Sequence, residues 1–446
     1  METKKLTNKF TKPKMWIFSS VKVSLGMGTI LMGWVTFFAT DYLGLNAATV
    51  GILFMVSKIF DGFTDLIAGY VIDKCHSKWG RGRPFDLAII GFWVCMILMF
   101  VVPTMSIGLT YAWVFLMYTL TNSIFYTLLN CADPVYMANV IDEPQQSISA
   151  NAIIGIACMV VSTVGGVVLP QLVANVGTTR EGWATIALAI GLPAIAIGML
   201  RFFIVKEKAG RNNGAEQFTI KDAFRVIVNN KYILIVALIN LISSAGQLMV
   251  QGATNYYCTY VLGDVGLASL MSLAMLSSLF SLILTPIITK KMGYTRFMRI
   301  LTVISIAAYF LRLINPYSVM LIFLTGFLCN IGVLTVWLYI STFIIDCMDY
   351  GEWHNGIRSE GSTSCAQSVF SKIGQAIGVG GVGILMGLSG YSGSLAVQPD
   401  SAINMLIAMF TFIPAISNII MYVLLRMYNL EEKLPQIRNE LAERNS

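Results

Sequence analysis

Charged side chains are scarce in this chain. Only 12% of its 446 residues are Asp, Glu, Lys or Arg, whereas an average soluble domain carries about 25%. Hydrophobic residues make up 56% of the sequence. This balance excludes an ordinary soluble globular protein, and a chain of this composition is expected to have the lipid bilayer as its solvent.

Histidine is almost absent, and cysteine forms no motif. The two histidines, His76 and His354, fall in predicted loops, so a membrane-embedded enzyme with a histidine-based catalytic set is disfavoured. The eight cysteines contain no CxxC pair, which indicates neither a metal site nor a disulfide framework. No cofactor is therefore predicted. The formal charge of +7 is carried by short loops and tails, so nucleic acid is not an expected partner.

Long apolar runs recur over the whole length. A helix of about 20 apolar residues spans about 30 Å of hydrocarbon, and nothing alternates with period two as barrel strands would. The predicted fold class is therefore all-α, a polytopic membrane protein with twelve transmembrane helices, numbered I to XII. The predicted spans are 16–40, 47–72, 85–105, 109–138, 147–175, 183–204, 232–261, 266–289, 297–314, 317–345, 361–388 and 402–427.

The distribution of polar residues predicts how these helices are grouped and oriented. The least apolar internal stretch, 206–231, is expected to be a cytoplasmic linker between six-helix bundles at 1–205 and 232–428, with a cytoplasmic tail at 429–446. Basic residues crowd the N-terminus, the II–III and VIII–IX loops, the linker and the tail. Because short loops rich in Lys and Arg stay in the cytoplasm, we expect a multi-pass protein of the plasma membrane with both termini inside.

Helix II carries ionisable residues within its membrane span, where each one costs free energy. Lys58, Asp61 and Asp65 share one helix face, and Thr64 borders it. Each such residue costs about 2.5 to 3.5 kcal/mol at the centre of a spanning helix, so it normally faces a partner or a transport path. The two carboxylates with a hydroxyl nearby suit a monovalent cation, or one Asp takes up a proton. The alternative is a structural pair between Lys58 and Asp61.

Two further helices carry polar stripes. Helix XI presents Ser364, Ser368, Lys372 and Gln375, and helix IV presents Asn122, Tyr126, Asn130 and Asp133, with Thr127 beside them. Such groups suit a polyhydroxylated ligand, although hydrogen bonding between helices is the alternative. Lys372 is long enough to approach the helix II carboxylates across the bundle. Trp337 on helix X is either a stacking surface for a sugar or a packing residue.

Four stretches together resemble one known family. They are Thr40-Asp41 to Gly44, Asp61 to Asp65 running on to Trp79–Pro84, Asn255 to Tyr260, and Asp346 to Trp353 with Gly356, Arg358 and Gly361. In these residues the chain is similar to the glycoside/pentoside/hexuronide:cation symporters. The resemblance implies a major facilitator fold, with a substrate site near the midplane between two halves, and sugar uptake by alternating access coupled to Na⁺, Li⁺ or H⁺.

The resemblance also implies roles for individual positions. Asp61, Asp65 and Thr127 match the family's cation-binding residues, and Thr64 lies beside them where sodium-using members often have Asn. Lys372 matches the lysine that links the cation and sugar sites, and Asn130, Trp337, Gln367 and Ser368 fall where the sugar pocket is lined. In the II–III segment, Asp73, Arg81 and Arg83 are predicted to act in gating.

Departures from the family pattern leave the solute and the ion open. Counting back from Thr40 places the helix I sugar-binding acid on Leu25, and helix V has no arginine. Asp133 is a new acid, which we predict to accept hydrogen bonds from substrate hydroxyls. The expected partners are therefore a small sugar or glycoside, a monovalent cation (H⁺ or Na⁺) and membrane lipid. A lysolipid or drug carrier of the same fold is the alternative, and a sugar sensor is disfavoured.

Overall fold

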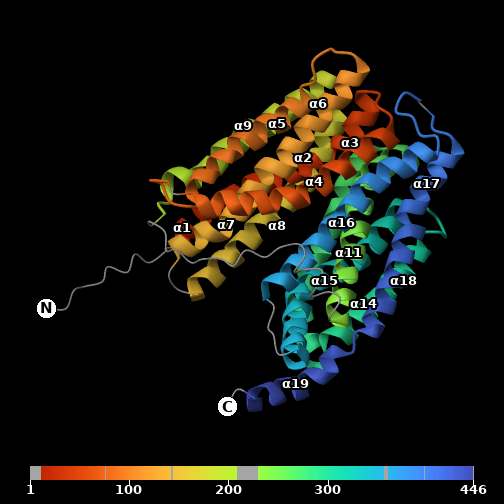
Figure 1. Ribbon diagram of the computed structural model, residues 1–446. Coiled ribbons are helices and arrows are strands. Elements are labelled where there is room, and N and C mark those ends of the chain that lie inside the picture. The colour runs from red at the N-terminus through yellow and green to blue at the C-terminus, as the bar shows by residue number, and fades with distance from the viewer. Residues whose placement is uncertain are drawn as a thin grey trace. The chain divides into compact units, whose positions relative to one another are not determined.

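The computed structural model describes residues 12–75, 77–141, 144–207, 230–355, 360–395 and 397–444. Over these residues helices joined by loops and turns make up the structure. One isolated bridge links Ser77 and Gly80, and no strand occurs in the described part of the chain. Each of the twelve predicted spans falls on helical structure (Figure 1). The all-α prediction is therefore confirmed.

The first six predicted spans correspond to the following elements. They are α1 (Lys12–Phe18), α2 (Ser20–Met32), α3 (Val35–Phe37) and η1 (Phe38–Tyr42) for helix I, α4 (Ala47–Lys74) for II, η2 (Arg83–Leu87) and α5 (Ala88–Phe100) for III, α6 (Ile107–Thr119), η3 (Leu120–Tyr126) and α7 (Thr127–Val140) for IV, α8 (Pro144–Asn175) for V and α9 (Arg180–Ile204) for VI. Helix III ends earlier than predicted, at Phe100, because Pro103 cannot continue it.

The last six spans are built in the same way. They are α11 (Lys231–Tyr256) and η4 (Tyr257–Val261) for VII, η5 (Val265–Leu267), α12 (Ala268–Leu273), η6 (Ala274–Leu276) and α13 (Ser277–Met292) for VIII, α14 (Tyr294–Leu311) for IX, α15 (Val319–Asn355) for X, α16 (Glu360–Leu388) for XI, and α17 (Asp400–Phe410) and α18 (Phe412–Met427) for XII. A further helix, α19 (Leu430–Arg444), occupies the predicted tail. The amphipathic part of the predicted linker lies outside the described residues.

Ten helices of the described chain are long and apolar enough to cross a membrane. The other two predicted spans are α4 and the helix VIII elements. Helix α4 has 28 residues, five of them charged. The helix VIII elements are individually short, the longest being the 16-residue α13.

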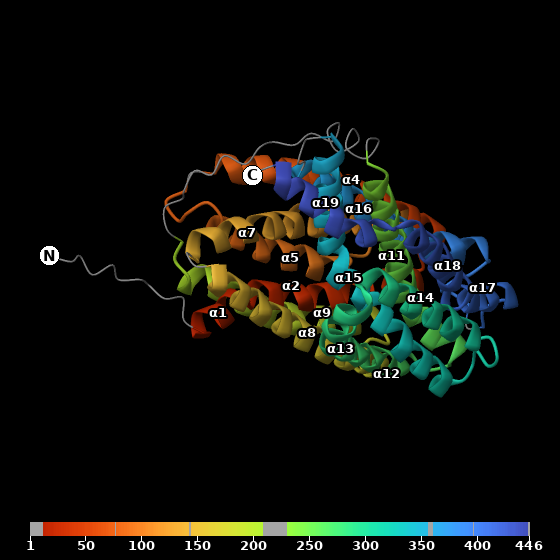
Figure 2. The same cartoon turned by 90° about the horizontal axis from the view of Figure 1, so that it is seen from below.

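The chain divides into two compact units. One consists of residues 1–35 and 60–213, and the other of residues 36–59 and 214–446. In the first unit α2 packs against α8 and α9, and α5 packs against α9 (Figure 1). In the second unit α11 packs along α16, and α14 lies between α15 and α18 (Figure 2). The C-terminal part of helix I and the first half of α4 therefore belong to the second unit.

Three spans contain a stretch of π-helix, namely η1 in helix I, η3 in helix IV and η4 in helix VII. A π-helical turn is rare and is frequent at functional sites, because the extra residue re-aims the side chains that follow it. η3 comes directly before Thr127. The structure thus places an irregular turn at the start of the helix IV segment that holds the predicted cation and sugar residues.

Candidate functional site

The predicted cation residues on helices II and IV converge. The Asp61 side chain is buried, with 6% exposure, and its Oδ1 accepts a hydrogen bond of 2.8 Å from the hydroxyl of Thr127. Thr64 donates its own hydroxyl to the carbonyl oxygen of Asp61 at 3.0 Å. Asp65 lies one turn further along α4 and is half-buried. The carboxylates and hydroxyls therefore offer only oxygen atoms, the ligands that suit an alkali cation.

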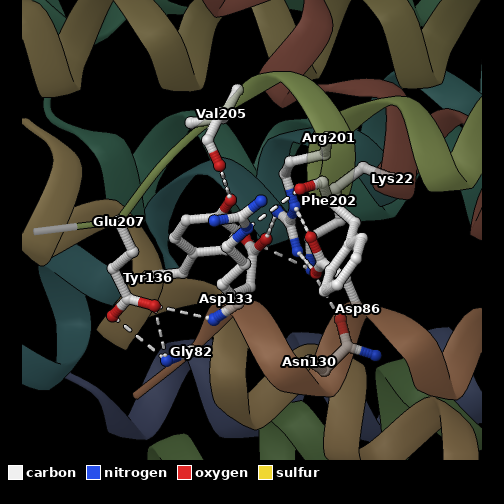
Figure 3. Close-up of polar contacts among 11 residues, drawn as sticks. Lys22, Gly82, Asp86, Asn130, Asp133, Tyr136, Arg201, Phe202, Val205 and Glu207 are labelled. Atoms are coloured by element: carbon white, nitrogen blue, oxygen red, sulfur yellow. Dashed lines mark hydrogen bonds and ion pairs between the residues drawn. The ribbon is translucent and has the colours of Figure 1, made fainter. Parts of the chain in front are cut away.

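The helix IV residues predicted to meet the sugar are part of a charged network within the first unit (Figure 3). Lys22, on α2, donates from Nζ to Oδ1 of Asn130 at 2.6 Å, and Nζ lies 3.6 Å from Oδ2 of Asp133. The other carboxylate oxygen of Asp133 accepts a hydrogen bond from Arg201 on α9. Asn130 and Asp133 thus both contact Lys22, and Asp133 also contacts Arg201.

Arg201 is the centre of this network and has no exposed surface. Its Nε and Nη2 donate to the two carboxylate oxygens of Asp86 at 3.0 and 2.5 Å, which is a bidentate pair. The guanidinium also lies 4.7 Å from the ring of Phe18 and 4.9 Å from that of Tyr136. A buried cation needs such partners, because an unpaired charge in a low-dielectric interior is strongly destabilising.

The charges in this network balance. Asp86 and Asp133 are two carboxylates, and Arg201 and Lys22 are two cations. Lys22 is the most accessible of the four side chains at 22% exposure. The negative charge of Asp133 is therefore offset by its neighbours, and Asn130 lies beside an ammonium group that donates hydrogen bonds. The prediction that Asp133 acts as an acceptor for substrate hydroxyls stays a prediction, with one oxygen already committed to Arg201.

Sequence reasoning missed three members of the network, namely Lys22, Asp86 and Arg201. Each is a charged residue inside or at the end of an apolar span, so the cost of burying a charge was the signal that identifies all three. Leu25, to which the helix I acid was assigned by counting, is buried in the core with 3% exposure. The polar group of helix I in this network is Lys22, three residues earlier.

The predicted gating loop is fixed by one carboxylate. Glu207, after α9, accepts hydrogen bonds from the backbone N–H groups of Arg81, Gly82 and Arg83 at 2.8 to 3.1 Å. Figure 3 shows the contact with Gly82. The Arg83 guanidinium donates to the carbonyl oxygen of Phe202 at 2.9 Å and lies over its ring. Asp73 lies in the last turn of α4, and its side chain is outside the described part of the structure. The loop is thus tied to the end of helix VI.

The remaining predicted residues belong to the second unit. Trp337 is 46% exposed, and its indole N–H donates to Oε1 of Gln247 at 3.1 Å. Gln367 is buried, yet neither polar atom of its side chain has a hydrogen-bond partner among the described residues. Ser368 is exposed and Lys372 half-buried on the same helix.

These observations define a class of protein. A helical chain with ten spans, among its described residues, that are long and apolar enough to cross a bilayer has the architecture of a multi-pass membrane protein. Known structures show the same fold. The crystal structure of a D-xylose-proton symporter matches with a TM-score of 0.64 at 14% identity, covering 91% of this chain and 96% of that one. No group of three or more His, Cys, Asp or Glu residues suited to a metal ion occurs in the described part of the chain.

The family follows from the sequence. The profile of the family described as MFS/sugar transport protein matches residues 17–432, so the chain belongs to this family of the major facilitator superfamily, whose members are transporters and not enzymes. The isoprimeverose transporter of Lactiplantibacillus pentosus is 26% identical, over 94% of this chain and 88% of that protein. The inner membrane symporter YicJ of Escherichia coli (strain K12) is 27% identical over 91% of each.

Proposed function

We propose that this protein imports a sugar or glycoside across the plasma membrane by cation-coupled symport with alternating access. The observation that carries the proposal is the buried carboxylate of Asp61 with the Thr127 hydroxyl at 2.8 Å, in a chain of the sugar transport family. Because a carboxylate in an apolar span is costly unless it binds a cation or a partner, Asp61, Thr64, Asp65 and Thr127 are assigned to the coupling ion, H⁺ or Na⁺.

The solute is assigned to polar groups in each unit. In the first unit these are Asn130 and Lys22, with Asp133 held behind them by Arg201. In the second unit they are Gln367, whose amide is unpaired within the described structure, and Trp337, Ser368 and Lys372. Amide and ammonium groups beside an indole suit a sugar, because they supply hydrogen-bond donors and a stacking face. The inner placement of both termini remains our proposal from the basic loops.

Substrate counterflow tests the solute part of the proposal. Purified protein in liposomes preloaded with one unlabelled sugar is supplied with a trace of the same labelled sugar, across a panel of pentosides, hexosides and uronides. A carrier gives transient accumulation of the label for the sugars that it recognises, without any ion gradient. Gln367→Leu is expected to abolish this exchange, and Gln436→Leu on α19 is the matched control. Absence of counterflow for every sugar in the panel contradicts the proposal.

A further inference from the structure

Two of the stretches that carry the family resemblance have no role in the cation or sugar assignments. These are Thr40-Asp41, which lies in η1, and the tyrosine-rich stretch that ends at Tyr260 in η4. The structure brings them together in the second unit. The Asp41 carboxylate accepts hydrogen bonds from the hydroxyl of Tyr260 and, at 2.7 Å, from that of Tyr391, which follows α16.

Among the described residues, the hydrogen-bond partners of the Asp41 carboxylate are neutral hydroxyl groups. Besides the two tyrosines, Thr40 lies 2.6 Å from Oδ2 of Asp41 and 2.8 Å from the hydroxyl of Tyr256. The ring of Tyr391 meets the rings of Tyr256 and Tyr260 edge to face, at 5.4 and 5.6 Å. Hydrogen bonds to a carboxylate are about twice as strong as those between neutral groups, so these hydroxyls hold the end of helix I firmly without an ion pair.

The backbone makes equally close contacts around this cluster. A Cβ atom at Gly393 would lie 2.2 Å from the carbonyl oxygen of Thr40, and one at Gly51 would lie 2.6 Å from the carbonyl oxygen of Gly380. Only glycine permits such an approach. The end of helix I and the first half of α4 therefore pack closely against α16 and the segment after it. This packing explains why residues 36–59 belong to the second unit.

Helix α4 connects the packed segment 36–59 to the predicted cation site. It is continuous from Ala47 to Lys74, and it passes from the second unit to the first between Ile59 and Phe60. Asp61 is the second residue after that point. Any rearrangement that breaks the contacts of residues 36–59 with α16 therefore moves the helix that carries both predicted cation carboxylates.

We propose that Asp41, Tyr260 and Tyr391 form a latch, which must be released each time the carrier opens to the outside. The proposal rests on the alternating-access function proposed above and on the predicted inner N-terminus, from which the end of helix I, with Asp41, falls at the outer membrane face. Tyr260 and Tyr391 lie on separate elements, and each donates one hydrogen bond to the same carboxylate. A single Tyr→Phe substitution therefore removes one of these bonds and preserves the packing of the ring. The Asp41 latch is thus a conformational element distinct from both binding sites.

Cysteine labelling from outside intact cells tests the latch without any substrate. The reporter is Ala39→Cys in a cysteine-free chain, because Ala39 is fully buried two residues before Asp41. We expect Tyr260→Phe and Tyr391→Phe each to raise the rate of labelling by a membrane-impermeant maleimide about tenfold. In an Asp41→Asn background the same substitutions should add little, because the shared acceptor is already changed.

Control variants separate the latch proposal from the proposed cation and solute assignments. Tyr317→Phe, which removes a hydroxyl from an exposed tyrosine, should leave Ala39→Cys shielded. Thr104→Cys, in the exposed loop before α6, should label in every variant if this side faces outward. Unchanged Ala39→Cys labelling in both Tyr→Phe variants, with normal amounts in the membrane, overturns the latch. Faster labelling in a protein that shows no sugar counterflow keeps the latch and rejects the proposed solute instead.

Discussion

Replacement of Arg201 by methionine tests the charged network of the first unit. The guanidinium is the shared partner of the Asp86 and Asp133 carboxylates and is completely buried. Methionine fills similar space but leaves both acids without it, and Lys22 at 3.6 Å from Asp133 is then the remaining cation of the network. Removal of one partner from a buried ion pair costs about 3 to 5 kcal/mol, which lowers the folded-to-unfolded ratio by about 100-fold or more.

The assay is thermal unfolding of the purified protein in detergent, followed by tryptophan fluorescence, with the amount in the membrane measured in parallel. Arg180→Met, at the exposed start of the same helix α9, is the matched control and should unfold like the wild type. In the Arg201→Met background, Asp86→Asn with Asp133→Asn should recover much of the lost stability, because the unpaired charges are gone. An Arg201→Met protein as stable as Arg180→Met refutes the reasoning.

Three further substitutions probe the proposed sites. Asp65→Asn should abolish accumulation against a gradient while counterflow persists, because the side-chain volume is kept and only the charge is lost; uphill uptake at the wild-type level removes Asp65 from the cation site. Lys372→Val and Lys372→Arg should both reduce uptake more than tenfold, since a guanidinium does not reproduce a compact ammonium; normal uptake by either variant makes Lys372 structural. Lys22→Gln should raise KM about tenfold with little change in the inserted amount, as its ammonium bonds to Asn130; an unchanged KM excludes Lys22 from solute binding.

The helical architecture was predictable from the sequence because hydropathy acts locally. A run of apolar residues must satisfy its own backbone hydrogen bonds in lipid, so its length and position suffice to place a helix. Helix α19 was missed for the converse reason, since its charged sequence has no apolar run and the helix is held by contacts made elsewhere. Arg438 on α19, for example, bonds to Asp346 and Asp349 on α15.

The grouping of the predicted cation carboxylates needed only the sequence, because Asp61 and Asp65 lie on one helix at a spacing that can be read directly. The partners of Arg201 are different. Asp86 and Asp133 are 115 and 68 residues away, and no local pattern pairs residues at such separations. Lys22 is the one charged residue of the predicted span 16–40. The cost of a charge in an apolar span was a sufficient signal for it, although its contact with Asn130 required the structure. The π-helical turns that present Asp41 and Tyr260 leave no hydropathy signal at all.

Gradient-driven uptake in liposomes, compared between wild type and Asp61→Asn, tests the central claim most directly. With a sugar that gives counterflow, a proton or sodium gradient is imposed separately, together with a membrane potential. One coupled cation supplies about 2.3 kcal/mol per 100 mV, enough for accumulation of about fifty-fold. The account predicts accumulation by the wild type under one of the two gradients, and mere equilibration by Asp61→Asn. Equal accumulation by both proteins, or no response of the wild type to either gradient, contradicts it.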